Sequence, residues 1–206
     1  FVAATKGLAA DTTERELADR LDRAMRDRGA SGPAFDTIVA AGPHAARPHH
    51  DPTDRPIEEG EPIIIDMGAR HRGYNADLTR TIWIGEATER LRTIYTIVFD
   101  ANAAARAGLR AGLTGAEADR LAREPIEAAG FGEQFTHSLG HGLGIKVHEA
   151  PSLRKTSEET LETGNVVTVE PGIYLPDWGG VRIEDVGVIA PDGVRILTEA
   201  PKFARF

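Results

Sequence analysis

The stretch EPIIIDMGARHRGYNADLTRTIWI, residues 61–84, decides the fold of this chain. Two runs rich in β-branched and aromatic residues, 61–69 and 74–84, flank a tight turn at His71-Arg72-Gly73. Such runs on either side of a short, glycine-containing turn are typical of an antiparallel hairpin. We therefore predict two adjacent strands here, and the rest of the sequence is interpreted around them.

Two acids, Asp66 and Asp77, lie within this hairpin. With a two-residue loop, Arg70 would pair with Gly73 and Asp66 would lie directly opposite Asp77. Opposed side chains share one face with Cβ atoms about 4.5–5.5 Å apart, where two like charges are destabilising. The apolar neighbours predict a partly buried sheet, in which such carboxylates need a proton or a cation. The alternative is a different register that leaves both acids in solvent.

A second acid-bearing hairpin is predicted from the valine-rich runs 165–175 and 181–190. Glu170 lies seven residues before Asp177 and Glu184 seven residues after it, and Asp177 falls in the turn that connects the two runs. The register is left open, so the two glutamates are either opposite or diagonal neighbours. The alternative is a surface ladder in which a basic neighbour neutralises them.

The remaining pattern predicts helices between hairpins. Two Thr-x-x-Glu capping boxes, which satisfy free amide groups at helix starts, open at Thr13 and Thr114. Pro125 should kink or shorten the second of these helices. Helices and hairpins without βαβ alternation favour an α+β fold with antiparallel sheet, and each half offers a helix and an acid-bearing hairpin, which hints at an internal repeat. The expected helices cover 13–29, 88–107 and 114–129, and further strands cover 36–41 and 194–197.

Three histidines, His137, His141 and His148, fall on or just after the glycine-rich stretch 131–147. The i, i+4 spacing of the first two is that of a helical zinc motif, but no glutamate follows His137 and the glycines oppose a helix. Glycine instead permits close backbone approach to a ligand. We interpret this stretch as part of a site.

A long loop over 42–61 carries His49 and His50. Loops of this length in compact domains are usually functional or disordered. A functional role for these histidines and simple solvent exposure remain equal alternatives on the local sequence alone.

Composition sets outer limits on function. The chain has 206 residues, a net charge of −8 and no cysteine. The acidic balance disfavours a nucleic-acid surface, no run approaches the ~20 apolar residues of a membrane helix, and disulfides and thiolate metal sites are excluded. The absence of cysteine favours, mildly, a cytoplasmic location.

Two acid hairpins and one imidazole form a hard, oxygen-rich ligand set. Such a set suits Mn²⁺, Fe²⁺, Co²⁺ or Zn²⁺ in a dinuclear arrangement better than a structural zinc site. Two metals ~3.5–4 Å apart can share a hydroxide that is nucleophilic near neutral pH, while neighbouring histidines bind the intermediate or pass protons. The implied chemistry is metal-assisted hydrolysis.

At this point the chain resembles a known family, the pita-bread metallopeptidases, which include aminopeptidase P, prolidase and methionine aminopeptidase. The resemblance implies a curved antiparallel sheet with flanking helices and an internal pseudo-two-fold repeat. It also implies a dinuclear centre, often of manganese or cobalt, with iron or zinc as further options. The motifs that carry it are Asp66-Met67-Gly68, Asp77, His141-Gly142-Leu143-Gly144, Val169-Glu170-Pro171-Gly172-Ile173-Tyr174 and Arg182-Ile183-Glu184-Asp185. The implied metal ligands are Asp66, Asp77, His141, Glu170 and Glu184, with Asp77 and Glu184 bridging both ions.

Within this family the motifs look like the Xaa-Pro branch, which implies hydrolysis of Xaa-Pro bonds in short proline-containing peptides by a dipeptidase or aminopeptidase P. The resemblance gives His49, His137 and His148 substrate-binding or proton-handling roles. Arg182 would support the ligands from behind. His50 and Tyr174 are weaker candidates.

The resemblance treats residues 1–206 as the catalytic domain of such an enzyme, with the family's N-terminal domain and the start of its first helix absent from this chain. A homodimer is the expected assembly, without nucleic-acid or membrane partners. Lys146 departs from the acidic or neutral residue that the family tends to have near its histidines, and Pro125 interrupts a helix that is normally uninterrupted. Other readings are a methionine aminopeptidase-like hydrolase, a non-catalytic pita-bread binding module, and a metal-independent hydrolase resembling creatinase.

Overall fold

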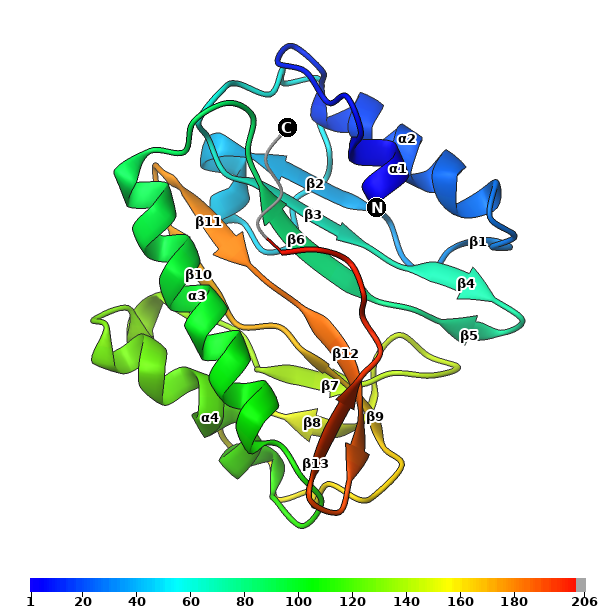
Figure 1. The fold of residues 1–206 in the computed structure, drawn as a ribbon, viewed down its shortest axis with the longest axis vertical. Helices are drawn as coiled ribbons and strands as arrows, with labels where there is room; N and C mark the ends of the chain where they lie inside the picture. Colours follow the sequence, from blue (N-terminus) through cyan, green and yellow to red (C-terminus); the bar gives the residue numbers. More distant parts are fainter. Residues whose placement is uncertain (203–206) are drawn as a thin grey trace.

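In the computed structural model, which describes residues 1–202, helices lie along the outside of several antiparallel sheets (Figure 1). Every strand pair among these residues is antiparallel. The prediction of an α+β fold with antiparallel sheet is therefore confirmed. No helix in this part of the chain has both the length and the apolar character needed to cross a membrane.

The N-terminal half places two helices beside two three-stranded sheets, ordered β2-β3-β6 and β1-β4-β5. Figure 1 shows α1 and α2 beside these strands. The predicted long loop begins with a short 3₁₀ helix, η1. The elements are α1 (Val2–Thr5), α2 (Glu14–Arg26), β1 (Gly32–Pro33), β2 (Ile38–Ala41), η1 (Gly42–Ala46), β3 (Ile63–Met67), β4 (Ala69–His71), β5 (Tyr74–Asn75) and β6 (Leu78–Ile82).

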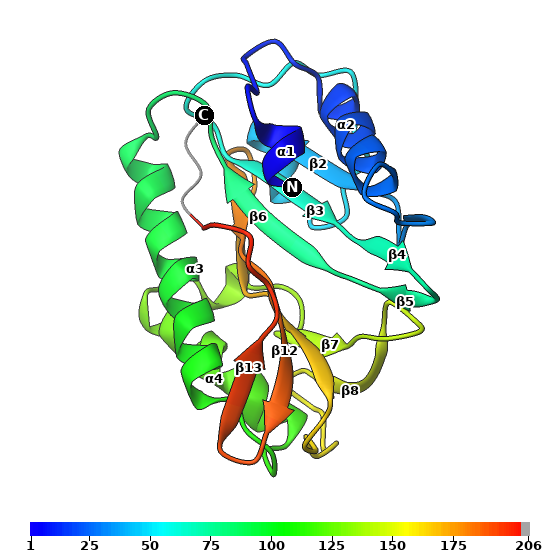
Figure 2. The same cartoon turned by 45° about the vertical axis from the view of Figure 1, so that its right-hand side comes forward.

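The C-terminal half packs two long helices against a five-stranded sheet, β13-β12-β9-β7-β8, and a hairpin of β10 and β11. Turning the molecule by 45° shows α3 and α4 on one side of these strands (Figure 2). The elements are α3 (Glu89–Gly108), α4 (Gly115–Ala128), η2 (Gly132–Gln134), β7 (Gly140–Gly142), β8 (Glu149–Leu153), β9 (Val166–Val169), β10 (Gly172–Leu175), β11 (Gly179–Arg182), β12 (Asp185–Ala190) and β13 (Gly193–Ile196).

Both capping boxes start helices as predicted, with reciprocal hydrogen bonds at Thr13 and Thr114. Pro125 was predicted to kink or shorten its helix. Shortening is wrong, because α4 continues through it to Ala128, and the kink stays a prediction. Proline removes one backbone donor from a helix interior. The buried face of α4, which includes Ala122 and Ile126 on either side of Pro125, packs into the core and holds the helix together despite that loss.

The turn of the first hairpin is at Arg72-Gly73. The predicted pairing of Arg70 with Gly73 would place it one residue earlier. His71 pairs with Tyr74, and Arg70 with Asn75. Both turn residues have positive φ, 51° and 86°, which is the geometry of the two-residue turns that match strand twist.

This turn shifts the predicted register by two residues, so Asp66 lies opposite Thr79 rather than Asp77. The predicted direct pairing of the two acids is therefore wrong. Side chains alternate with a period of two along a strand, so a shift of two leaves both acids on the same face. The acids are diagonal neighbours, with Asp77 at the entry to β6.

The structure shows the register of the second hairpin, which the sequence left open. β9 and β12 pair Val169 with Asp185, and β10 and β11 pair Gly172 with Arg182. Both ladders follow the same register, and in the interval between them Glu170 falls opposite Glu184. The ladder is interrupted at the two glutamates, which frees both to face inward.

The apolar interior forms two main clusters. The larger one joins α3 and α4 to the strands of the C-terminal half, and the smaller one joins α1 and α2 to β2, β3 and β6. Each half thus has its own core. The predicted internal repeat accords with this arrangement and stays a prediction.

Candidate metal centre

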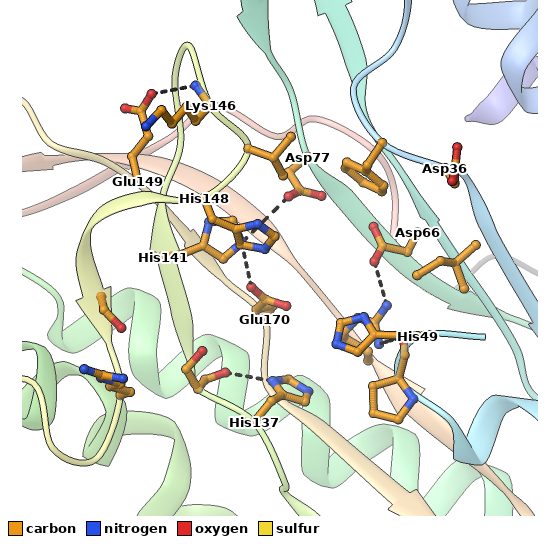
Figure 3. Close-up of a pocket in the computed structure, with 18 of the residues that line it drawn as sticks. Asp36, His49, Asp66, Asp77, His137, His141, Lys146, His148, Glu149 and Glu170 are labelled. Carbon is orange, nitrogen blue, oxygen red and sulfur yellow. Dashed lines mark hydrogen bonds and ion pairs between the residues drawn. The ribbon is translucent and has the colours of Figure 1, made fainter. Parts of the chain in front are cut away.

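A cleft of about 1030 Å³ lies between the two halves and is lined by four of the five predicted ligands, Asp66, Asp77, His141 and Glu170. Its wall also includes His49, His137, His148 and Arg182. Figure 3 shows the labelled side chains converging from both halves. The fifth predicted ligand, Glu184, is buried, with 1% of its surface exposed.

Three of the acids form a tight group. One carboxylate oxygen from each of Asp66, Asp77 and Glu184 lies within 4.8 Å of the other two. Asp66 comes from β3, Asp77 from the entry to β6, and Glu184 from the break between β11 and β12. Thr79 links the halves, because its hydroxyl donates to Glu184 Oε2 at 2.9 Å and its carbonyl accepts from the Glu184 amide.

His141 connects this group to the remaining acid. Its Nε2 lies 3.3 Å from Glu170 Oε1 and 3.9 Å from Asp77 Oδ2. Its Nδ1 lies 3.0 Å from the Gly142 carbonyl, which can only accept a hydrogen bond, so the proton on the neutral ring belongs on Nδ1. Nε2 then faces the acids: it donates to Glu170 when the ring is protonated, and it offers a lone pair to a metal when the ring is neutral.

Glu170 is held in place by β9 and β7. Thr168 donates its hydroxyl to Glu170 Oε1 at 3.0 Å, and the His141 amide donates to the same hydroxyl. The structure thus brings all five predicted ligands to one place, from segments more than a hundred residues apart. Their binding of a metal stays a prediction.

The charges in this group are unbalanced. Burial, reinforced by Asp66 and Glu170, raises the pKa of Asp77 to about 8. Burial and then the charge of Asp77 raise the pKa of Glu184 well above its ordinary value, and burial also raises that of Asp66. Acids this close cannot all ionise without a positive partner.

In the Glu170–His141 pair the two side chains stabilise each other's charged form, unlike the acids of the three-acid group. Burial alone would raise the pKa of Glu170, but the hydrogen bond from His141 and nearby positive charge lower it to about 2. Burial likewise opposes the charged form of His141, and the hydrogen bond with Glu170 outweighs it and raises the pKa of His141 to about 8.

Two buried oxygens test whether a cation fits. Asp66 Oδ1 and Glu184 Oε1 have no hydrogen-bond partner among the described residues, although buried polar atoms normally have one. Both belong to the three-acid group. Hard carboxylate oxygens with one imidazole suit divalent cations of the Mn²⁺, Co²⁺ or Zn²⁺ kind, so the residues present fit the predicted metal.

Arg182 lies behind Asp66. Its Nη2 donates to Asp66 Oδ2 at 2.7 Å, and its Nη1 donates to the Tyr174 hydroxyl at 2.8 Å and to the Pro48 carbonyl at 3.3 Å. The side chain is 3% exposed. The predicted role of Arg182, support of the ligands from behind, stays a prediction.

His137 faces the same tyrosine. Its Nδ1 donates to the Ser138 carbonyl at 2.8 Å, and its Nε2 lies 2.8 Å from the Tyr174 hydroxyl. Burial lowers the pKa of His137, which favours the neutral ring. Tyr174, a weak candidate from sequence, therefore joins His137 to Arg182 by one hydroxyl.

His148 and His49 complete the wall of the cleft. The ring of His148 lies 4.3 Å from that of His141, and burial and the neighbouring His141 lower the pKa of His148. His49 lies on the opposite side of the cleft in Figure 3. Lys146 lines the outer part, with its backbone amide bonded to Glu149.

His50 differs from its neighbour. Its ring is buried and bonds Glu14, an acid at the start of α2. Sequence reasoning missed Glu14, because a glutamate in the first turn of a helix is common. Thr79 and Thr168 were also missed, because a threonine in a strand is too common to mark a site.

With the geometry established, the chain can be compared with known proteins. Residues 1–191 match the pattern of metallopeptidase family M24. The chain belongs to metallopeptidase family M24. The predicted resemblance to the pita-bread metallopeptidases is confirmed.

Relatives of this M24 chain include an Xaa-Pro dipeptidase of Pyrococcus furiosus, 43% identical over 201 residues, covering 98% of this chain and 58% of the relative. The uncharacterised peptidase YqhT of Bacillus subtilis is 48% identical over 190 residues, covering 92% of this chain and 54% of YqhT. The chain thus spans little more than half the length of these relatives.

Solved structures agree with the predicted pita-bread fold. An Xaa-Pro dipeptidase from Bacillus anthracis matches with a TM-score of 0.97 and 43% identity, over 99% of this chain and 58% of that one. An X-Pro aminopeptidase from Thermotoga maritima matches with a TM-score of 0.96 and 43% identity, over 100% of this chain and 58% of that one.

Proposed function

We propose that this chain is the catalytic part of a metal-dependent exopeptidase that hydrolyses Xaa-Pro peptide bonds. The observation that carries the proposal is the convergence of three acids and one histidine on one cleft, with the buried Glu184 grouped against two of these acids and two buried carboxylate oxygens left unpaired. Relatives named Xaa-Pro dipeptidase and X-Pro aminopeptidase support the substrate class.

In this proposal Asp66, Asp77, His141, Glu170 and Glu184 hold two divalent ions, with manganese as the expected metal. When bound, the ions supply Lewis-acid activation of water and polarisation of the scissile carbonyl. The acids from both halves supply negative charge that the bare cleft cannot balance. The number of acids, with the resemblance to dinuclear metallopeptidases, supports two ions rather than one.

The surrounding residues orient the substrate and move protons. His148 and His49 face the cleft and are placed to contact a peptide carbonyl or leaving nitrogen. His137 already bonds Tyr174, so its role in this state is to stabilise the wall of the cleft. Arg182 holds Asp66 in place. Asp77 and Glu184 are buried, which strengthens the electrostatic interactions they make.

The test is hydrolysis of Ala-Pro and longer Xaa-Pro peptides by protein supplied with Mn²⁺. Asp77→Ala should abolish turnover, because the three-acid group loses a member, while Asp192→Ala, which removes an exposed acid far from the cleft, should retain it. Full activity in Asp77→Ala would refute the proposal. Cleavage of Met-Ala in preference to Ala-Pro would support the methionine aminopeptidase alternative.

A homodimer and a cytoplasmic location belong to the same proposal. Sedimentation of the purified protein tests the first, and cell fractionation tests the second. Metal analysis by mass spectrometry identifies the ion and its number per chain, and a protein unable to bind any divalent ion would favour the non-catalytic binding module.

A further inference from the structure

A buried carboxylate outside the metal centre holds the loop that carries His49. Glu14 begins α2 and is completely buried. Its Oε1 accepts from the Ala41 amide at 2.8 Å, and its Oε2 accepts from the Thr53 amide at 3.0 Å and the Thr53 hydroxyl at 2.7 Å. One side chain thus fixes both ends of the segment 41–53.

Two histidines of the same segment also bond Glu14. His44 Nδ1 lies 3.0 Å from Oε1, and His50 Nε2 lies 3.0 Å from Oε2. The two rings lie 4.3 Å apart. A buried acid with this many donors anchors the loop at four residues along its length.

The group Glu14, His44 and His50 could also be read as a cation site, since its ligand atoms lie within 4.8 Å of one another. The hydrogen bonding argues against that reading. Five donors already meet two oxygens that offer about four lone-pair positions. Neither oxygen of Glu14 is unpaired, in contrast to Asp66 and Glu184 in the metal centre.

The anchored segment leads directly to the cleft. His50 points to Glu14, whereas the adjacent His49 lines the cleft. The carbonyl of Pro48 accepts from Arg182 on the other side. His49 therefore lies between two fixed points, one in the N-terminal helix layer and one in the metal centre.

We propose that Glu14 is a positioning residue that sets the place of His49 in the cleft through His44, His50 and Thr53. The inference rests on the proposed function, which assigns substrate handling to His49. Glu14 lies outside the predicted ligand set and acts on the reaction only through the loop. Its effect on activity must therefore depend on the presence of His49.

A double-mutant cycle tests this dependence. Glu14→Gln keeps the size of the side chain and removes its charge, and should lower kcat/KM for Ala-Pro roughly ten- to hundred-fold, the cost of a misplaced catalytic group. In a His49→Ala background the same change should lower kcat/KM by less than about twofold, since coupled residues are non-additive. Equal losses in both backgrounds would overturn the proposal.

Hydrogen exchange on the metal-free protein gives a readout independent of activity. Glu14→Gln should speed amide exchange over residues 41–53 and leave β7 and β9 unchanged. Asp54→Asn is the matched control, because it breaks an exposed ion pair with Arg15 at the same junction. Unchanged exchange in Glu14→Gln would refute the anchoring, whereas a wild-type protein inactive on Xaa-Pro peptides would refute only the proposed function.

Thr53→Val provides a second variant if Glu14→Gln folds poorly. It removes the 2.7 Å hydroxyl donor and leaves the carboxylate in place. A smaller loss of kcat/KM is expected, again only when His49 is present. A loss of the same size in the His49→Ala background would contradict the proposal.

Discussion

Tyr174 serves two buried partners with one hydroxyl. Arg182 donates to it, so its own hydrogen is free to go to His137 Nε2, whose Nδ1 is committed to Ser138. Burial raises the pKa of Tyr174 to about 12, so the hydroxyl keeps its proton at neutral pH. The geometry assigns this tyrosine a structural task that its sequence context did not.

Tyr174→Phe should lower the free energy of unfolding by about 1–3 kcal/mol, because it leaves a buried donor on Arg182 and a buried acceptor on His137 unpaired. Urea denaturation of the metal-free protein measures the change. Tyr74→Phe, which removes the hydroxyl of an exposed tyrosine, is the matched control and should leave the free energy of unfolding nearly unchanged. An unfolding free energy equal to that of the wild type would contradict the assignment.

Glu14 should make the protein sensitive to acid. Burial would raise its pKa, but the hydrogen bonds from Ala41, His50 and Thr53 prevail and lower it below the ordinary 4.5. A carboxyl with a lowered folded pKa stabilises the protein above its ordinary pKa, and this stabilisation is lost as the pH falls through the folded value.

Glu14→Gln should therefore cost about 2–4 kcal/mol of unfolding free energy at pH 7. The difference from wild type should shrink as the pH falls below 4.5. Urea titrations at several pH values between 3 and 7 (roughly the range in which carboxyl groups titrate) measure it. A difference that stays constant with pH would show that charge is not the cause.

Single residues also show where sequence reasoning succeeds. Asp66, Asp77 and Glu184 were predicted because charged groups in apolar strands need an explanation. Glu14 was not recognised and Tyr174 was only a weaker candidate, since a glutamate in a first helical turn and a tyrosine in a strand are both common. Their significance comes from partners distant in sequence.

At the scale of elements, β7 depends on glycine. A Cβ on Gly140 would lie 2.1 Å from the Thr168 carbonyl oxygen of β9, and one on Gly142 would lie 2.2 Å from the Ala150 carbonyl oxygen of β8. Both neighbours are backbone atoms that cannot move aside cheaply. The glycine-rich stretch interpreted from sequence as a site thus lets β7 sit close to its neighbours while His141 points into the cleft.

Gly140→Ala should lower the free energy of unfolding by about 3 kcal/mol, through overpacking between β7 and β9. It should also weaken divalent-metal binding, because His141 moves with β7. Thermal denaturation and metal titration measure the two effects. Gly193→Ala, where an added Cβ meets nothing within 4 Å, is the control and should leave both unchanged.

The hairpins show what periodicity can and cannot predict. Alternation predicted the strands and placed each acid pair on one face, with a solvent-facing arrangement left open as the alternative. The register of the first hairpin was predicted wrongly by two residues, because positive φ at Arg72 moves the turn. A turn conformation of this kind depends on one or two residues and leaves no periodic signal.

At the scale of the molecule, a divalent ion should join the two halves. Asp66 and Asp77 come from the N-terminal half, whereas His141, Glu170 and Glu184 come from the C-terminal half, and each half has its own apolar core. An ion bound to both halves stabilises only the folded chain, by about 2.7 kcal/mol at a free concentration 100 times its Kd.

Mn²⁺ at that concentration should raise the Tm by roughly 5–10 °C for a chain of this size. The same ion should leave the Tm of Asp77→Ala nearly unchanged. Differential scanning calorimetry with and without a chelator measures both. An equal rise in wild type and variant would show that the ion binds elsewhere.

The Thr79–Glu184 contact has a consequence for the making of the protein. During synthesis the hairpin with Asp66 and Asp77 is complete about a hundred residues before Glu184 is added. A nascent chain with only the first hairpin therefore offers two carboxylates and no partner strand to close around an ion. With the proposed ligands, metal loading is a late step of biogenesis. An ion can be held in the cleft only after both halves have been translated and have docked.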